Sequence, residues 1–81
     1  MRIRVLAFAV ARDILGNEEV VVDLNDDATL IELKAALGEE YPEAAEIVTR
    51  SAFALNQQYI LDDRALEDGM QLALIPPVSG G

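Results

Sequence analysis

The residues of this sequence best suited to chemistry stand at its end. The last six are Pro76-Pro77-Val78-Ser79-Gly80-Gly81. Two prolines cannot continue a hydrogen-bonded strand and hold the backbone extended. Two glycines carry no Cβ, so they can enter a narrow channel and adopt backbone angles closed to other residues. We therefore expect a stiff arm that presents the Gly81 α-carboxylate to a partner protein.

The rest of the composition excludes most catalytic sites. The 81 residues include no Cys and no His. This removes thiolate nucleophiles, Cys-based metal sites and the usual general base near neutral pH. We expect no metal site and no catalytic machinery in the chain, so that the Gly81 carboxylate is its only reactive group. The alternative is an inert end, because chain termini often tolerate change.

The charge balance bears on the class of partner. Six basic against fifteen acidic residues give a net charge of −9, while hydrophobic residues make up 52%. That hydrophobic content excludes a disordered acidic tail. Nucleic acid is not an expected partner, because the acidic surface repels phosphate. A basic protein partner fits better, with Asp62-Asp63 and Glu67-Asp68 as candidate contacts, although a solvated surface explains any one cluster more simply.

Hydrophobic patterning predicts one α+β domain. The expected strands are residues 2–9, 18–24, 52–55, 59–61 and 70–75. The first two are close in sequence and should pair antiparallel. A short helical turn over residues 10–15, closed by Gly16-Asn17, should connect them.

One principal helix is expected to cover the sheet. Thr29 and Glu32 have the spacing of a capping box at its start. Its apolar stripe consists of Leu30, Leu33 and Leu37. Gly38 is the expected stop, and Pro42 should open a further short helix.

The N-terminus imitates a signal peptide, but its pattern favours a strand. The apolar run ends at Arg12-Asp13, and its start alternates Arg2/Arg4 with Ile3/Val5. No stretch approaches the ~18–20 apolar residues of a membrane span. We therefore expect a cytoplasmic protein without a membrane partner.

Leu6 and Phe8 are the candidate binding residues within the domain. They share the strand face opposite Ile3 and Val5, and one principal helix covers only one face of a sheet. An uncovered apolar pair can form a partner-binding patch. The alternative, that loops cover both side chains, is equally consistent with the sequence.

The whole chain resembles a known family. The order ββα, a loop region and ββ is similar to a ubiquitin-like β-grasp fold. The segment from Leu74 to Gly81 resembles the tail of the small subunit of molybdopterin synthase, the MoaD family of sulfur carriers. Further resemblance lies in residues 5–9, 12–16, 54–57 and 66–69. The sequence departs from the family at Ala7 and Ile75, where relatives often carry aromatic residues.

The resemblance implies a fold and a division into two parts. The fold is a mixed sheet of about four to five strands with one main helix across one face. Residues 1–75 form the β-grasp domain, and residues 76–81 form the extended tail.

The resemblance also implies a function without a stably bound cofactor. A MoeB-type adenylating enzyme, using ATP and Mg²⁺, joins the Gly81 carboxyl group to AMP. A persulfide sulfur donor then converts it to a thiocarboxylate. In a complex with the MoaE-type large subunit, this sulfur passes to cyclic pyranopterin monophosphate and builds the molybdopterin dithiolene. The partner-binding residues would be Pro76, Pro77, Val78, Ser79 and Gly80, together with Phe8 and Leu6.

Three other functions remain open. A ThiS-type carrier supplying thiamine biosynthesis has a similar fold and ending, although Pro-Pro-Val-Ser-Gly-Gly favours the molybdenum cofactor. A ubiquitin-like modifier would join Gly81 to lysines of other proteins. A plain interaction module would have an inert tail.

Overall fold

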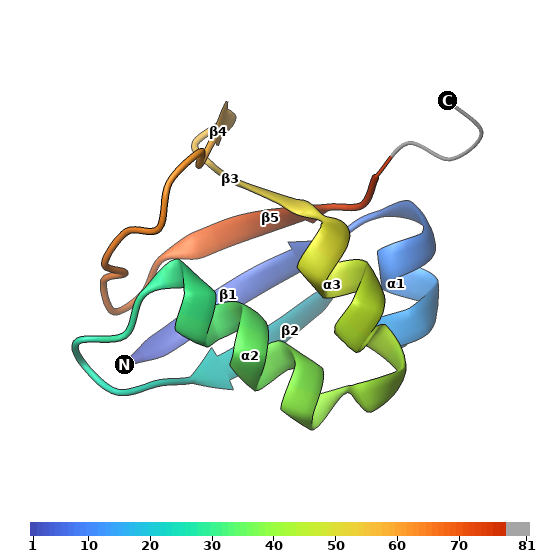
Figure 1. Cartoon of the computed structure of the whole chain (residues 1–81), viewed down its shortest axis with the longest axis horizontal. Coiled ribbons are helices and arrows are strands. Elements are labelled where there is room, and N and C mark those ends of the chain that lie inside the picture. Colours follow the sequence, from blue (N-terminus) through green and yellow to red (C-terminus); the bar gives the residue numbers. More distant parts are fainter. Residues whose placement is uncertain (78–81) are drawn as a thin grey trace.

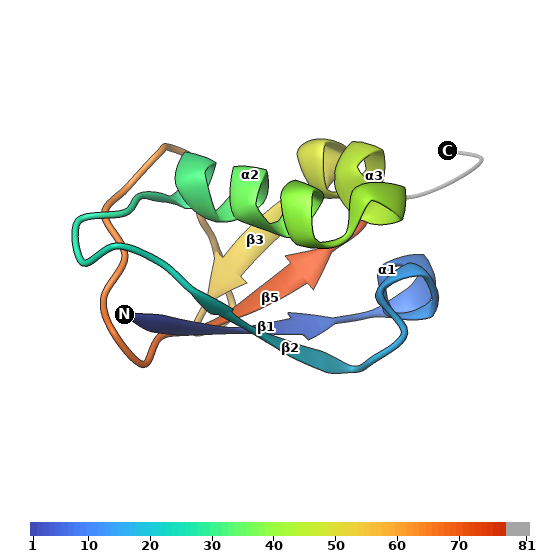
Figure 2. The ribbon, with the colours of Figure 1, turned by 90° about the horizontal axis from the view of Figure 1, so that it is seen from below.

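The computed structural model describes residues 1–77, which form a sheet with helices against one face (Figures 1 and 2). Its strands are β1 (Arg2–Ala7), β2 (Glu19–Asp23), β3 (Ala52–Leu55), β4 (Gln58–Tyr59) and β5 (Gln71–Ile75). Its helices are α1 (Ala9–Leu15), α2 (Leu30–Glu40) and α3 (Ala45–Arg50), with a 3₁₀ turn η1 (Pro42–Ala44) before α3.

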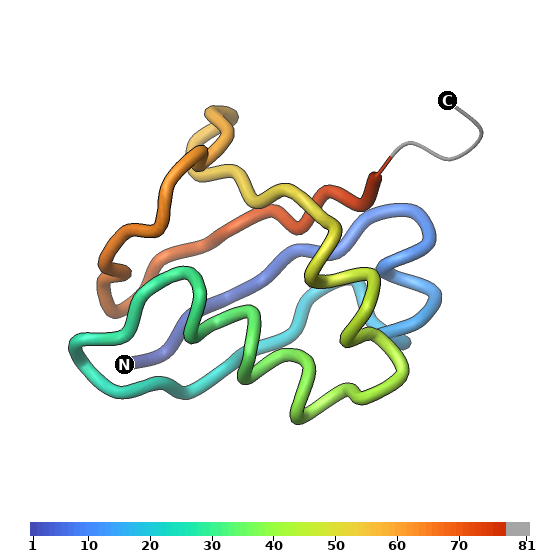
Figure 3. Tube along the Cα trace, in the orientation of Figure 1, coloured from blue at the N-terminus to red at the C-terminus, as the bar shows by residue number. Residues whose placement is uncertain are grey.

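The strand order brings the two ends of the sequence together. The sheet runs β2-β1-β5-β3-β4, with β1 and β5 parallel at its centre and the other neighbours antiparallel. The chain trace shows the first and last strands side by side, both running toward α1 (Figure 3). The parallel pairing places the end of β5, and hence the start of the tail, beside the start of α1.

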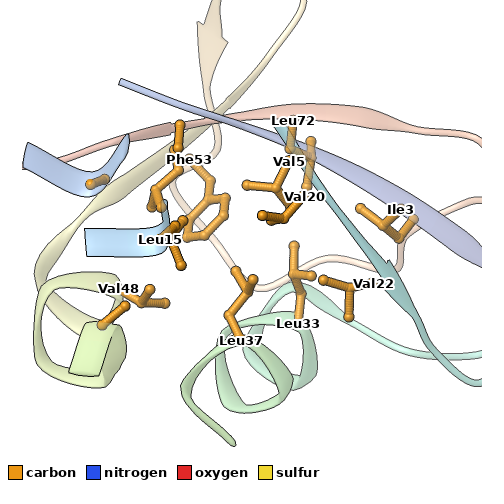
Figure 4. Packing of buried hydrophobic residues seen from close by; sticks show 14 of the residues in the cluster. Ile3, Val5, Leu15, Val20, Val22, Leu33, Leu37, Val48, Phe53 and Leu72 are labelled. Atoms are coloured by element: carbon orange, nitrogen blue, oxygen red, sulfur yellow. The ribbon is translucent and has the colours of Figure 1, made fainter. Parts of the chain in front are cut away.

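The core lies between the sheet and α2, as the leucine stripe predicts. Alternate residues of a strand point to the same face, and the helix-facing set is fully buried. Sheet side chains meet Leu33 and Leu37 of α2 in the packing view (Figure 4). The other labelled core residues there are Ile3, Val5, Leu15, Val20, Val22, Val48, Phe53 and Leu72.

Two predicted strand boundaries are wrong. The first strand ends at Ala7, because Ala9 has a φ of 51° and turns the chain into α1. The fourth strand is Gln58–Tyr59, because Asn56 and Gln57 both take positive φ, 52° and 68°, in a tight turn. That turn sets Leu55 opposite Gln58, so the strand starts one residue earlier than expected; the Ile60 N–H still donates to the Phe53 carbonyl at 2.8 Å, but Leu61 lies beyond the strand.

The predicted capping box is also wrong. Thr29 is the N-cap of α2, but its side chain makes no capping hydrogen bond. The Ile31 N–H donates instead to Asp63 Oδ1 at 2.9 Å, and the Leu30 N–H donates to the Arg64 carbonyl at 3.0 Å. The loop before β5 therefore supplies the acceptors that the local sequence was expected to provide.

Gly38 does not stop α2, which continues to Glu40. A Cβ at Gly38 would lie 3.3 Å from the Cβ of Ala45, so the glycine allows α3 to approach α2 closely. Pro42 opens η1 and then α3, as predicted.

The chain thus adopts the predicted α+β β-grasp fold. Within residues 1–77, no helix combines the length and apolar character needed to cross a membrane.

Candidate functional site

The tail leaves the sheet at a position fixed by β5. Leu72 and Leu74 anchor this strand in the core, and the strand ends at Ile75. Pro76 and Pro77 follow, and neither has an N–H with which to continue strand pairing. The predicted roles of Val78, Ser79, Gly80 and Gly81 lie outside the residues that the structure describes.

One face of the sheet carries a row of apolar side chains toward the tail. Strand register places Leu6 opposite Ala73, Ala73 opposite Ala54, and Ala54 opposite Tyr59. Directly opposed residues project from the same face, so the row crosses β1, β5, β3 and β4. No helix among residues 1–77 packs on this face (Figure 2).

This row lines a groove of about 770 Å³. We call it the sheet-face groove and define it by Leu6, Phe8, Ala54, Tyr59, Ala73 and Ile75. Its apolar members include Phe8, which is 49% exposed, and Tyr59, which is 60% exposed, while Asn56, Gln57 and Gln71 add polar side chains to its lining. Exposed apolar surface that the fold does not bury is typical of a protein-docking site.

Leu6 and Phe8 lie where the strand alternation predicts them. Phe8 stands half-exposed at the N-cap of α1, with extended backbone, and the positive φ of Ala9 directly after it turns the chain away. Leu6 is partly buried in the same groove. Of the two alternatives, the structure of residues 1–77 favours the open patch over coverage by loops. Partner binding by this pair stays a prediction.

Tyr59 and Ile75 belong to the groove, although the sequence reasoning did not select them. Ile75 has the same strand parity as Ala73, which places it on the uncovered face. Tyr59 reaches the row only because β4 pairs with β3. Strand alternation in the sequence could have revealed Ile75, whereas Tyr59 could be found only from the pairing of β4 with β3.

The other half of this face is polar. Arg2 forms an ion pair with Asp23 at 3.3 Å, and Arg4 forms one with Glu19. These pairs link β1 to β2, the edge away from the apolar row. Apart from Val21 of β2, which is 45% exposed opposite Arg4, the exposed apolar side chains of this face lie on the part of the sheet from which the tail departs.

One residue from each of the two predicted acidic contacts accepts a hydrogen bond within the domain. Asp63 accepts the Ile31 N–H, as described above, and Asp68 Oδ1 accepts the Arg2 N–H at 2.7 Å. Among residues 1–77, no group of three or more acidic side chains is placed to hold a metal ion. What the described residues offer is an exposed groove beside Pro76 and Pro77, where the tail leaves the sheet.

Comparison with known proteins decides the family. The ThiS family model matches residues 5–81, which is nearly the whole chain and includes the diglycine end. The chain belongs to the ThiS family. The resemblance to MoaD-type sulfur carriers, predicted from the tail and the element order, is confirmed by this match together with the full-length relatives described next.

Individual relatives agree with the ThiS-family assignment. The molybdopterin synthase sulfur carrier subunit of Chlamydomonas reinhardtii is 40% identical over 83 residues, with 100% of each chain covered. Among solved structures, SAMP1 from Haloferax volcanii superposes with a TM-score of 0.85 at 27% identity, with 100% of each chain covered. A chain in the complex of subunits 1 and 2 of the molybdopterin-converting factor from Helicobacter pylori superposes with a TM-score of 0.69 at 34% identity. Again, 100% of each chain is covered.

Proposed function

We propose that this chain is the sulfur carrier subunit of a molybdopterin synthase and that Gly81 carries the sulfur as a thiocarboxylate. The observation that carries the proposal is full-length similarity, at 40% identity, to a carrier subunit of that name. The family match continues through Gly81, the residue to which the proposal gives the chemistry.

The chemistry requires activation of a poor acyl group. A carboxylate repels nucleophiles and has no good leaving group. In the adenylating partner, a Gly81 carboxylate oxygen attacks the α-phosphate of ATP and pyrophosphate leaves. The terminal sulfur of a persulfide donor then attacks the acyl carbon and AMP leaves. A donor thiol cleaves the remaining S–S bond and becomes oxidised, which leaves the thiocarboxylate on Gly81.

The division of labour follows from the residues present. With no Cys and no His, the chain offers no thiolate or imidazole for these steps, so they belong to its partners. ATP and Mg²⁺ are used in the adenylating enzyme, and cyclic pyranopterin monophosphate binds in the large subunit. The chain itself is a non-catalytic carrier.

The surface around the tail root supports this role. We assign the sheet-face groove, with Leu6 and Phe8, to the large subunit, and the Helicobacter relative is itself in a complex of subunits 1 and 2. Pro76 and Pro77 direct the arm away from β5. Gly80, Ser79 and Val78 would lie within the channel that the arm enters, and the small Gly80 permits close approach of the enclosing protein.

A gene deletion tests the proposal in the cell of origin. We expect the deletion strain to lose molybdopterin and the activity of molybdenum enzymes. The wild-type gene should restore both, and a variant lacking Gly81 should not. Glu40→Ala, an exposed change on α2, is the control and should rescue fully. A strain that keeps its molybdopterin but requires thiamine would contradict the proposal and favour the ThiS-type alternative.

A protein-modifier function is the second candidate because of one structural observation. SAMP1 stands for small archaeal modifier protein 1. The chain superposes on two crystal structures of this protein from Haloferax volcanii, with TM-scores of 0.85 and 0.81. As a modifier, Gly81 would form isopeptide bonds to lysines of other proteins. Immunoblots of a tagged chain should then show ladders of adducts that disappear when Gly81 is deleted.

A further inference from the structure

A second apolar groove lies on the helix side of the tail root. It measures about 650 Å³ and is formed by α1, α3 and the residues that leave β5. We call it the tail-root groove and define it by Phe8, Val10, Ile47, Arg50, Ile75 and Pro76. Figure 1 shows α1, α3 and the end of β5 meeting at this corner of the molecule.

The two grooves are continuous. Phe8 and Ile75 line both of them. A partner seated on the sheet-face groove therefore reaches the tail-root groove across these two side chains. Contacts in both grooves would hold Ile75, the last residue of β5, from two sides and so fix the direction in which the arm departs.

The fold does not explain why this groove is apolar. Helix α1 packs into the core through Ala11 and Leu15, which are buried. Val10 points elsewhere and is 44% exposed, so a polar residue there would cost the core little. Together with the half-exposed Phe8, it leaves apolar surface at the point from which the arm must be guided.

The charged side chain that lines this groove is basic, although the chain as a whole is acidic. The net charge is −9, yet among residues 1–77 no acidic residue lines the tail-root groove, and the one charged residue that does is Arg50. Arg50 is 65% exposed and faces Glu46 at 3.6 Å, one helical turn away. An exposed ion pair at this spacing contributes little to stability, so Arg50 can accept another carboxylate at little cost.

We propose that the tail-root groove binds a segment of the synthase large subunit that carries an aliphatic or aromatic anchor next to a carboxylate. The anchor packs on Val10, Ile47 and Phe8, and the carboxylate pairs with Arg50. This inference rests on the proposed function, which names the large subunit as the partner. It adds a second contact surface and the chemistry of the segment that occupies it.

Two valines of equal exposure give a matched test. Val10 is 44% exposed and lines the groove, whereas Val21 of β2 is 45% exposed and lines neither groove. The affinity of the full chain for the large subunit of the same organism is measured by titration calorimetry. We expect Val10→Asp to weaken binding by about tenfold or more, and Val21→Asp to leave it within about twofold. The unfolding midpoint of each variant verifies that it is folded.

Charge reversal tests the carboxylate. Arg50→Glu should weaken binding by about tenfold and reduce its dependence on NaCl concentration, while Arg50→Lys should retain most of the affinity. Equal affinities for the wild type, Val10→Asp and Arg50→Glu would overturn the inference and leave the proposed function standing. A wild-type chain that does not bind the large subunit at all would overturn both. If Val10→Asp lost affinity but Arg50→Glu did not, the proposed pairing of a partner carboxylate with Arg50 would be overturned.

Discussion

At the scale of single residues, Asp63 sets the start of the principal helix. Its Oδ1 accepts the Ile31 N–H at 2.9 Å, a bond that joins residues 32 positions apart. Removing a capping acceptor typically costs ~1 kcal/mol. We expect Asp63→Ala to lower the free energy of unfolding by about that amount in urea titrations. Asp62→Ala changes an exposed neighbour, and an equally large effect there would contradict the capping role.

Phe8 lines both the sheet-face groove and the tail-root groove. It is half-exposed, so its loss should change the folded domain little while removing an aromatic anchor from the docking surface. We expect Phe8→Ala to weaken binding of the large subunit by about tenfold. Ile31→Ala removes an exposed apolar side chain on α2 and should leave the affinity unchanged. Comparable losses for the two variants, measured by calorimetry, would show that the grooves are not the binding surface.

Some of these residues could be found from the sequence and others could not. Leu6 and Phe8 followed from strand alternation, and the tail followed from its prolines and glycines, which no core position explains. Val10 and Tyr59 gave no such signal, because their placement depends on contacts between segments far apart in the chain. The cap at Thr29 was predicted wrongly for the same reason, since the acceptor comes from a distant loop.

At the scale of elements, Gly38 sets the distance between α2 and α3. A Cβ there already comes within 3.3 Å of Ala45, so a branched side chain must push the helices apart. We expect Gly38→Val to lower the free energy of unfolding by about 1–3 kcal/mol. The exposed change Ala35→Val on α2 carries only the helix-propensity cost, below ~1 kcal/mol. Equal costs in urea titrations would mean that the close approach is unimportant.

The elements themselves were largely predictable, and their ends were not. Apolar periodicity gave the strand and helix order because one face of each element must be buried. A glycine in a helical pattern indicates a stop, but at Gly38 it serves packing against a helix that follows. The end of β1 depends on the positive φ of Ala9, an alanine whose type gives no warning of such a turn.

At the scale of the whole molecule, unbalanced charge opposes folding. The net charge is −9 and the Cα radius of gyration is 11.6 Å. The Debye length is ~30 Å at 0.01 M salt, well beyond that radius, and falls to ~8 Å at 0.15 M. Like charges across the domain therefore repel one another at low salt, and salt should relieve this.

We expect the Tm to rise by about 4–8 °C between these two salt concentrations, the shift that ~1 kcal/mol produces in a domain of this size. Glu40→Lys, which replaces one negative charge by one positive, should have a higher Tm at low salt and a smaller salt effect. A Tm that falls on adding salt would show instead that attractive ion pairs dominate.

The central claim concerns the whole chain acting as a carrier, and intact-mass spectrometry tests it most directly. The purified protein is incubated with ATP, Mg²⁺, a persulfide donor and the adenylating enzyme of its own cell. A mass increase equal to exchanging one oxygen for one sulfur is expected, and it should be absent when ATP is omitted and in the variant lacking Gly81. An unchanged mass, with the enzyme shown to adenylate another substrate, would contradict the account.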